Sequence, residues 1–272
     1  MCHLKRHSKL TLFADDTTIS SFGKDSTEII SKLELDLNLI VEWLSYNRLV
    51  INVTKSKAMF FSHYIRKSNE QKLLINSLKI KCNNEDIDFT KEIKVLGVTI
   101  DNELKFNSQI DNICKKVNSK TFLLRKSLYL FTDNFKPILF KLFIQPNFDY
   151  CSTLLMHIST ITQRDKLNSC FIKSVKRLLK LKKLTINTPI ENQKIILEPY
   201  NILPLFYRQF FRYCTFVFNV LKNKNLFLNT CLKDKTDRKT RSDFIIPVFK
   251  TNFKKLSFSV IAFAILQLLH SA

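Results

Sequence analysis

Glycine and proline are scarce in this sequence. Its 272 residues contain two glycines and six prolines, against 24 phenylalanines. Because tight turns depend on glycine and proline, this composition disfavours a sandwich or barrel of many short strands and favours long helices. Hydrophobic residues make up 45% of the chain, which is enough to bury a core. We therefore expect a folded, largely helical protein of one large or two modest domains.

The cysteines lack the spacing of a metal site or a disulfide framework. Seven of them are scattered along the chain, without a Cys-x-x-Cys pair and without histidines at matching intervals. This pattern argues against a zinc knuckle. An odd, scattered set is typical of reduced thiols, so we expect a cytoplasmic or nuclear protein.

No segment has the pattern of a secretory signal or a membrane span. Residues 1–9 are polar and basic, and the apolar run after them is too short for a signal peptide. Residues 256–269 are mostly apolar, but about 14 residues are short for a bilayer, so we expect a buried helix there. We expect no membrane association.

Acidic residues are outnumbered almost two to one. The chain has 44 Lys and Arg against 23 Asp and Glu, a formal net charge of +21. Such a protein attracts polyanions through counterion release. The basic residues are spread along the chain and form no single juxtamembrane cluster, which favours nucleic acid over a membrane surface. We expect RNA and DNA as partners, while the sequence gives no indication of the oligomeric state.

Carboxylates are absent from the first 14 residues, and the first two then stand side by side as Asp15 and Asp16. They interrupt two short runs of strand-forming residues over positions 10–20, which predicts a hairpin with the aspartates at its turn. Adjacent carboxylates repel unless a divalent cation or donors compensate, and hard-cation phosphoryl-transfer sites use such pairs. The alternative is a solvated polar turn.

Three motifs in order resemble reverse transcriptases. Phe13-Ala14-Asp15-Asp16 resembles the catalytic motif of the enzymes of non-LTR retrotransposons of the jockey-like kind. Trp43 and the segment 47–60, with Asn52-Val53-Thr54-Lys55-Ser56, resemble the Trp, Asn-x-Leu and Asn-x-x-Lys signature that follows. Residues 95–101, which include Gly97, are similar to the primer-grip hairpin of the family.

The resemblance implies RNA-directed DNA synthesis by nucleotidyl transfer. It implies Mg²⁺ held by Asp15 and Asp16, Lys55 near the phosphates of the incoming nucleotide, and Gly97 near the primer end. The resemblance implies a further metal-binding aspartate on an upstream strand, and we expect that strand and the fingers to be missing here. We therefore expect the chain to be inactive alone. Without the resemblance, Lys55 is a solvated turn lysine and Gly97 an ordinary bulge glycine.

Apolar periodicity and capping spacings predict the helices, and β-branched runs predict the strands. Asp25 with Glu28, Ser108 with Asp111, and Thr162 with Asp165 have capping-box spacing. We expect helices from Asp25, from Ser108, over 132–148 with a stop at Pro146, and from Thr162, and strands over 49–61, 73–80 and 92–101.

The helix expected from Ser108 is strongly basic on its non-apolar faces. In the family this region is the thumb, which follows the primer–template duplex through phosphate contacts. The alternative is a basic, solvated helix. The residues that we expect to bind nucleic acid here are Lys115, Lys116, Lys120, Arg125 and Lys126.

The densest basic cluster comes at the end of the helix expected from Thr162. Nuclear localisation, nucleic-acid binding and a solvated helix end are all compatible with it. Its members are Lys176, Arg177, Lys180, Lys182 and Lys183.

Together these features predict an α+β protein, the C-terminal portion of a reverse transcriptase. We expect a truncated palm over residues 1–101, a thumb-like helical segment over 102–131, and a mostly α-helical region over 132–272. Two alternatives remain open: a non-catalytic, basic nucleic-acid-binding remnant, and a translated pseudogene without a selected role.

Overall fold

The computed structural model describes residues 7–14, 16–23, 25–61, 79–82 and 85–222. The chain divides into two compact units, residues 1–103 and 104–272. Small antiparallel sheets lie in the first unit and helices dominate the second, so the mixed α and β composition is confirmed. The helix expected over 256–269, and residues 73–78 of one expected strand, lie outside the described residues.

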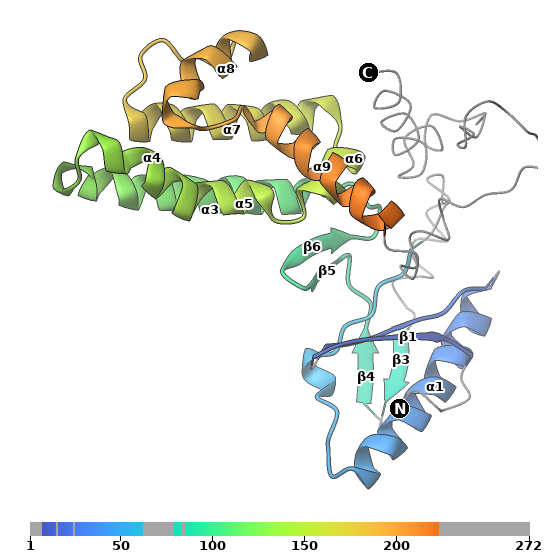
Figure 1. Cartoon of the computed structure of the whole chain (residues 1–272). Coiled ribbons are helices and arrows are strands. Elements are labelled where there is room, and N and C mark those ends of the chain that lie inside the picture. The colour runs from blue at the N-terminus through green and yellow to red at the C-terminus, as the bar shows by residue number, and fades with distance from the viewer. Residues whose placement is uncertain (1–6, 15, 24, 62–78, 83–84, 223–272) are drawn as a thin grey trace, which may run out of the picture. The chain divides into compact units, whose positions relative to one another are not determined.

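The described part of the first unit combines a long helix with three β-hairpins (Figure 1). Each hairpin forms its own two-stranded antiparallel sheet among the described residues. The elements are β1 (Lys9–Phe13) and β2 (Asp16–Ser20), α1 (Ser26–Tyr46), the 3₁₀ turn η1 (Val53–Lys55), β3 (Lys79–Cys82) and β4 (Glu85–Asp88), and β5 (Glu92–Val95) and β6 (Val98–Asp101).

The core of this unit forms where α1 packs on the β3–β4 hairpin. Leu37 comes from the apolar stripe of α1, and Ile80 and Ile87 are cross-strand partners in the hairpin. Ala58 and Cys82 complete the buried cluster, and Ile19 of β2 packs against it. The 3.6-residue periodicity that predicts α1 therefore also identifies the face of α1 that is buried.

Helix α1 begins where the sequence predicts, but the expected capping box is wrong. Asp25 is the N-cap residue and makes no side-chain cap hydrogen bond. Glu28 pairs instead with Lys32, one turn further along the helix. The Glu28 carboxylate thus binds Lys32 on the helix surface and does not bind the backbone at the start of the helix.

The strands predicted over residues 49–61 are also wrong. This segment contains the 3₁₀ turn η1, and Ala58 alone makes an isolated parallel bridge, to Phe89. The side chain of Asn52 hydrogen-bonds to nearby groups of its own turn, which offers the backbone an alternative to a strand ladder.

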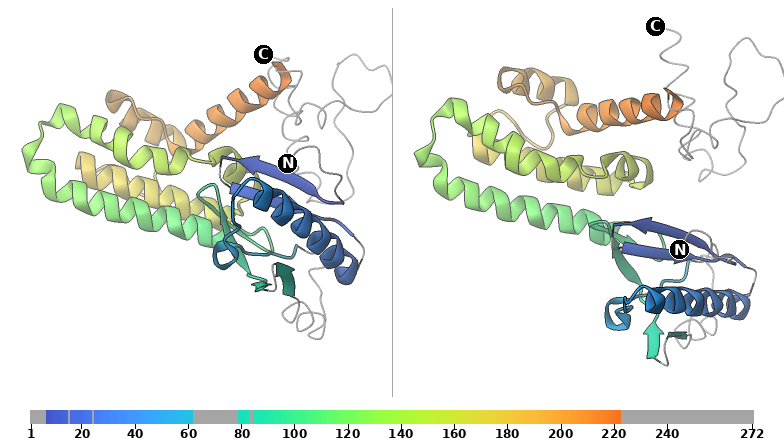
Figure 2. Two further views of the ribbon diagram at one scale, coloured as in Figure 1. Left: turned by 90° about the horizontal axis from the view of Figure 1, so that it is seen from below. Right: turned by 60° about the horizontal axis from the view of Figure 1, so that its bottom comes forward.

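The described part of the second unit is helical. Figures 1 and 2 show α3 and α7 side by side and running in the same direction. The segment from α4 to α5, which connects them in the chain, runs in the opposite direction. The elements are α3 (Asn107–Ser127), η2 (Leu128–Leu130), η3 (Asp133–Phe135), α4 (Lys136–Leu139), the π-helix η4 (Phe140–Ile144), α5 (Gln145–Asp149), α6 (Ser152–Ile158), α7 (Ile161–Leu179), α8 (Ile190–Leu197), η5 (Glu198–Tyr200) and α9 (Leu205–Lys222).

The core of the second unit is centred on the fully buried Phe171 of α7. Its ring meets those of Phe140 and Phe148 edge-on, at centroid distances of 5.6 Å each. Val117 of α3 is fully buried in the same unit. Edge-to-face aromatic pairs add to the stabilisation from apolar burial. Three of the chain's abundant phenylalanines therefore contribute to this core.

Pro146 does not end the second predicted helix. The helical segment continues through it to Asp149, and a π-helical stretch, Phe140–Ile144, precedes it. Proline has no N–H and crowds the carbonyl four residues earlier, which is that of Leu142. The π turn widens the helix at this carbonyl and lets the chain continue.

Helix α7 starts two residues before the predicted position. Thr160 is its N-cap: its hydroxyl accepts from the Gln163 N–H at 3.3 Å, and the Gln163 side chain accepts from the Thr160 N–H at 2.8 Å. This complete capping box replaces the one expected between Thr162 and Asp165. The cap predicted for α3 is wrong as well, because its N-cap is Phe106 without a side-chain hydrogen bond, and Asp111 pairs with Lys166 of α7.

Candidate functional site

The hairpin predicted around the aspartate pair is confirmed. Strands β1 and β2 pair from Lys9↔Ser20 to Phe13↔Asp16, and Ala14 is the described residue of the turn between them. Ala14 has a positive φ of 52°, as a tight hairpin turn requires. Asp16 is the first residue of β2, and Asp15 lies outside the described residues.

The carboxylate of Asp16 lies on the outer face of this hairpin. Side chains alternate along a strand, so Asp16 and its cross-strand partner Phe13 share one face, and Ile19 is on the other. Ile19 packs against the core of the unit, whereas Asp16 is exposed and Phe13 is 62% exposed. The face that carries Asp16 and Phe13 is therefore available to a ligand, and the unpaired strand edges beside it are available to another strand.

Lys55 lies in a turn that Asn52 organises. The Asn52 side-chain oxygen accepts from the backbone N–H of Lys55 at 3.1 Å and from the Thr54 hydroxyl at 2.7 Å. The Ser56 hydroxyl donates to the Asn52 carbonyl at 2.9 Å. Val53 packs against the core, so the turn is anchored while the Lys55 side chain stays exposed. The Asn-x-x-Lys-Ser pattern therefore has a local structural reason, which is the presentation of a lysine from a rigid turn.

The described residues do not form a complete metal site. No group of three or more His, Cys, Asp or Glu side chains comes together in the described ranges, and no ion pair joins Asp16 to Lys55 there. Mg²⁺ requires near-octahedral oxygen coordination. Asp16 supplies one carboxylate, and it is the only member of the predicted aspartate pair among the described residues. A two-metal centre therefore needs further ligands.

Gly97 is a turn residue and not part of a strand. The β5–β6 hairpin pairs Val95 with Val98, so Leu96 and Gly97 form its two-residue turn. Their φ angles are 47° and 82°. Positive φ at both central positions is typical of a type I′ hairpin turn, which explains why glycine occurs here. The expectations of a continuous strand and of a bulge glycine are both wrong.

The basic residues predicted on α3 are exposed. Lys115 and Lys116 lie off its buried face, which includes Ile113 and Val117. Lys120 donates to the Asn147 side chain of α5 at 3.0 Å, and the Lys126 ammonium lies 4.7 Å from the centre of the Phe122 ring. The apolar stripe of α3 thus orients these cations toward solvent, as phosphate contacts would require.

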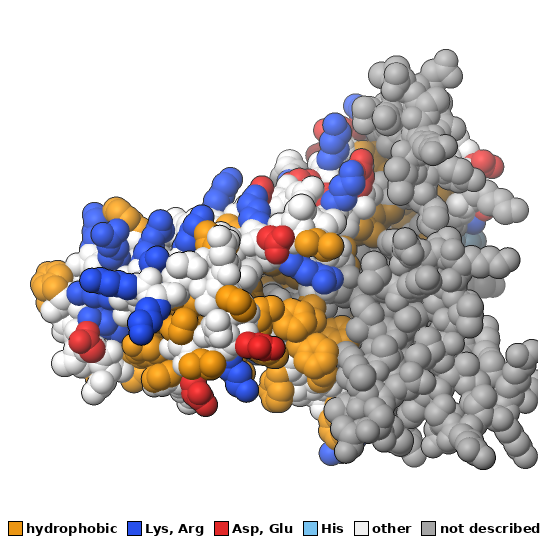
Figure 3. Space-filling model, turned by 90° about the horizontal axis from the view of Figure 1, so that it is seen from above, with side chains coloured by type: hydrophobic (Ala, Val, Ile, Leu, Met, Phe, Trp, Pro, Cys, Tyr) orange, Lys and Arg blue, Asp and Glu red, His pale blue; other side chains and the backbone are white. Residues whose placement is uncertain are grey.

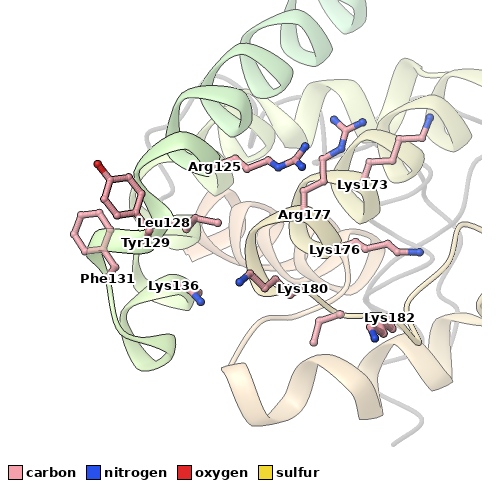
Figure 4. A pocket seen from close by; sticks show the side chains of 11 residues that line it. Arg125, Leu128, Tyr129, Phe131, Lys136, Lys173, Lys176, Arg177, Lys180 and Lys182 are labelled. Atoms are coloured by element: carbon pink, nitrogen blue, oxygen red, sulfur yellow. The ribbon is translucent and has the colours of Figure 1, made fainter.

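A basic groove lies where α3 and α7 end. Figure 3 shows Lys and Arg side chains gathered at this end of the second unit, and Figure 4 shows the groove, with a volume of about 820 Å³. Seven of its lining residues are cationic and none is acidic. They are Arg125, Leu128, Tyr129, Phe131, Lys136, Lys173, Lys176, Arg177, Lys180, Leu181 and Lys182.

The sequence identifies this groove only in part. Arg125 was expected to bind nucleic acid, and most of the 176–183 cluster lines the groove. Tyr129, Phe131, Lys136 and Lys173 were missed, because only tertiary packing brings the end of α3, the start of α4 and α7 to one groove. Exposed aromatic residues between basic helices are a signal that could have identified them.

Groups with strongly shifted pKa values lie in the core of the second unit. Hydrogen bonding with Cys114 and burial raise the pKa of the Cys170 thiol well above its usual range. Burial likewise raises the pKa of Tyr213. These groups stay neutral at physiological pH and are structural parts of the helix packing.

Within the described ranges, no helix is both long and apolar enough to cross a membrane. Comparison of the chain with protein-family models, with curated proteins and with solved structures finds no match.

Proposed function

We propose that these residues are part of a reverse transcriptase of the non-LTR retrotransposon type, in which they supply one side of the polymerase active site. The observation that supports this most directly is the position of Asp16, the described member of the aspartate pair. Asp16 follows the turn of an antiparallel hairpin and is exposed on the face opposite the core. Such a position allows a carboxylate to coordinate a metal ion without loss of packing.

Lys55 adds a second element of the proposed site. It belongs to the same unit as the hairpin, and the hydrogen bonds of Asn52 hold its turn in place. A preorganised ammonium group can neutralise the charge that develops on a leaving pyrophosphate. Asp15 and Asp16 would help to hold Mg²⁺, which would supply the activation of the primer hydroxyl.

The proposed site needs more strands and ligands than the described residues supply. Among the described strands, β1 and β2 pair only with each other, and an isolated two-stranded hairpin is marginally stable in water. A third strand with a further carboxylate would complete both the sheet and the metal ligands. We therefore expect no primer extension from this chain alone with Mg²⁺ or Mn²⁺.

A chimera tests the proposal. The fingers and upstream palm of an active non-LTR reverse transcriptase are fused before Leu10, and extension of an RNA-templated DNA primer is measured. Asp15→Asn should abolish extension, because a lost metal ligand commonly lowers the rate by orders of magnitude. Lys55→Ala should slow extension and leave template binding unchanged, because other cations can replace part of its charge.

Matched controls remove similar groups outside the proposed site. Asp25→Asn alters an exposed carboxylate without a cap hydrogen bond, and Lys57→Ala alters an exposed lysine two residues from Lys55. Both should leave extension unchanged. A folded chimera that extends primers equally well with Asp15→Asn would contradict the proposal.

A second candidate function is nucleic-acid binding without catalysis, and the exposed cations of α3 favour it. The chain should then bind RNA and DNA duplexes with little sequence preference, and the affinity should fall steeply as salt rises. Reversing the charges of Lys115, Lys116 and Lys120 should weaken duplex binding more than reversing those of Lys79 and Lys81. Equal losses would contradict a binding role for α3.

A further inference from the structure

The basic groove of the second unit concentrates positive charge from several elements. Arg125 comes from the last turn of α3, Lys136 from α4, and Lys173 and Arg177 from α7, while Lys180 follows the end of α7. In Figure 4 the Arg125 side chain extends from α3 toward that of Arg177 on α7. Like charges that converge are unfavourable without a counter-charge, so the groove is suited to an anionic ligand.

Most of these cations lack an acidic partner. Lys136 forms an ion pair: its ammonium group hydrogen-bonds to Asp133, which is 90% exposed, while the Lys136 side chain is 9% exposed. The charge of Lys180 also acts on Asp133 and lowers the pKa of its carboxyl, without an ion pair between the two. Within the part of the chain that the structure describes, no ion pair is formed by Arg125, Lys173, Lys176, Arg177, Lys180 or Lys182.

Helix ends explain only part of this arrangement. Cations in the last turn interact favourably with the helix dipole, which accounts for Arg125 on α3 and for Lys176 and Arg177 on α7. The dipole does not account for cations outside the last turns, such as Lys173 and Lys182. It also does not explain aromatic side chains in the same groove.

Aromatic rings form one end of the groove. The rings of Tyr129 and Phe131 lie next to one another there (Figure 4), and Phe131 also stacks on Phe135 at a centroid distance of 6.5 Å. Tyr129 is 83% exposed and Phe135 is 52% exposed. Exposed aromatic rings beside unpaired cations match the two requirements of single-stranded nucleic acid, namely faces for base stacking and charges for phosphates. In a duplex the bases stack on one another, so they are not available to stack on these rings.

We propose that this groove binds a single-stranded segment of RNA or DNA. Arg125, Arg177 and Lys180 hold the phosphates, and Tyr129 and Phe131 stack against the bases. The site is separate from Lys115, Lys116 and Lys120, which do not line the groove. The inference does not require polymerase activity, so failure of the chimera would leave it unchanged, and its own failure would leave the aspartate site unchanged.

Fluorescence anisotropy with the full chain tests the groove. The probes are a labelled oligouridylate of about twelve nucleotides, its deoxy counterpart, and a blunt duplex of similar length. Arg125→Gln combined with Arg177→Gln should weaken binding of both single strands at least about tenfold more than binding of the duplex. The slope of log Kd against log salt for single strands should fall by about 1.4, because each of two phosphate contacts contributes about 0.7.

The aromatic contribution has its own variant series. Tyr129→Leu should weaken single-strand binding by about five- to one-hundred-fold, as expected for loss of one stacked base, and Tyr129→Phe should retain it. The matched control for charge is Lys194→Gln combined with Lys222→Gln, which removes two exposed cations outside the groove and should change neither probe selectively. Circular dichroism confirms that each variant is folded.

Three results would overturn the proposal. The first is an equal loss of duplex and single-strand binding in the Arg125 and Arg177 variant, which indicates a general polyanion surface. The second is wild-type affinity of Tyr129→Leu for single strands. The third is a loss in the Lys194 and Lys222 control that equals the loss in the groove variant. A difference between the RNA and DNA probes would identify which of the two strands the groove prefers.

Discussion

The side chains of Asp149 and Arg208 form a two-point ion pair between α5 and α9. Arg208 Nε donates to Asp149 Oδ1 at 2.7 Å and Nη2 donates to Oδ2 at 2.5 Å, across 59 residues of sequence. Their side chains are 13% and 24% exposed. Arg212 lies 3.8 Å from the same carboxylate. Planar, bidentate pairs of this kind add geometric specificity to charge, so the pair fixes where α9 docks.

Removal of Arg208 should destabilise the second unit. Arg208→Ala leaves a mostly buried carboxylate with only Arg212 nearby, and we expect the free energy of unfolding to fall by about 2–3 kcal/mol. Arg208→Lys should cost less, because it keeps the charge and loses the fork. Urea unfolding with a double-mutant cycle against Asp149→Asn measures the coupling.

The matched control is the exposed pair of Lys79 and Asp86, joined at 2.8 Å. Its removal by Lys79→Gln should have no measurable effect, because solvent screens exposed pairs. An Arg208→Ala variant as stable as wild type would show that α9 docks without this ion pair.

The turn of the β5–β6 hairpin should respond in opposite directions to two substitutions. Gly97→Ala places a side chain at a φ of 82° and should lower the free energy of unfolding by about 1 kcal/mol or more. Leu96→Asn should raise it by about 0.5–1 kcal/mol, because Asn-Gly is the favoured pair for a type I′ turn. Thermal unfolding followed by circular dichroism measures both, and destabilisation by Leu96→Asn would contradict the turn assignment.

The pairing of Asp133 with Lys136 should be visible in acid. The hydrogen bond from Lys136 and its charge, with a contribution from Lys180, hold the pKa of the Asp133 carboxyl below its usual value. Because this pKa is lower in the folded than in the unfolded protein, the ionised Asp133 stabilises the fold at any pH above its unfolded-state pKa, which is near 4 for an aspartate. This contribution is lost as the pH falls below about 4 and through the folded-state pKa. NMR titration of the carboxyl carbon should show the low midpoint.

Lys136→Met serves as the comparison for that titration. It removes the donor, so the midpoint of Asp133 should rise toward the ordinary aspartate value. An unchanged midpoint in this variant would show that Lys136 does not stabilise the ionised form of Asp133.

Elements with a strong local pattern could be predicted from the sequence. The alternation before Asp15 and the β-branched residues after Asp16 predict the hairpin, because strand formation there depends on neighbouring residues. The stripe that contains Leu37 and Ile40 predicts α1 and its buried face in the same way. The caps could not be predicted reliably, because several residues with suitable spacing compete. Thr160 and Gln163 form the cap of α7, in place of Thr162 and Asp165. Asp111, which was expected to cap α3, forms an ion pair with Lys166 on a neighbouring helix instead.

The candidate sites divide along the same line. Asp16 begins a strand of a local hairpin and Lys55 lies in a local turn, so a short stretch of sequence is enough to place each of them. The Asp149–Arg208 pair and the basic groove join residues from helices far apart in the chain, and no local periodicity records such pairings. Long-range packing around Phe171 brings these helices together, because burial of apolar surface is non-directional and selects partners through the shape of the whole core.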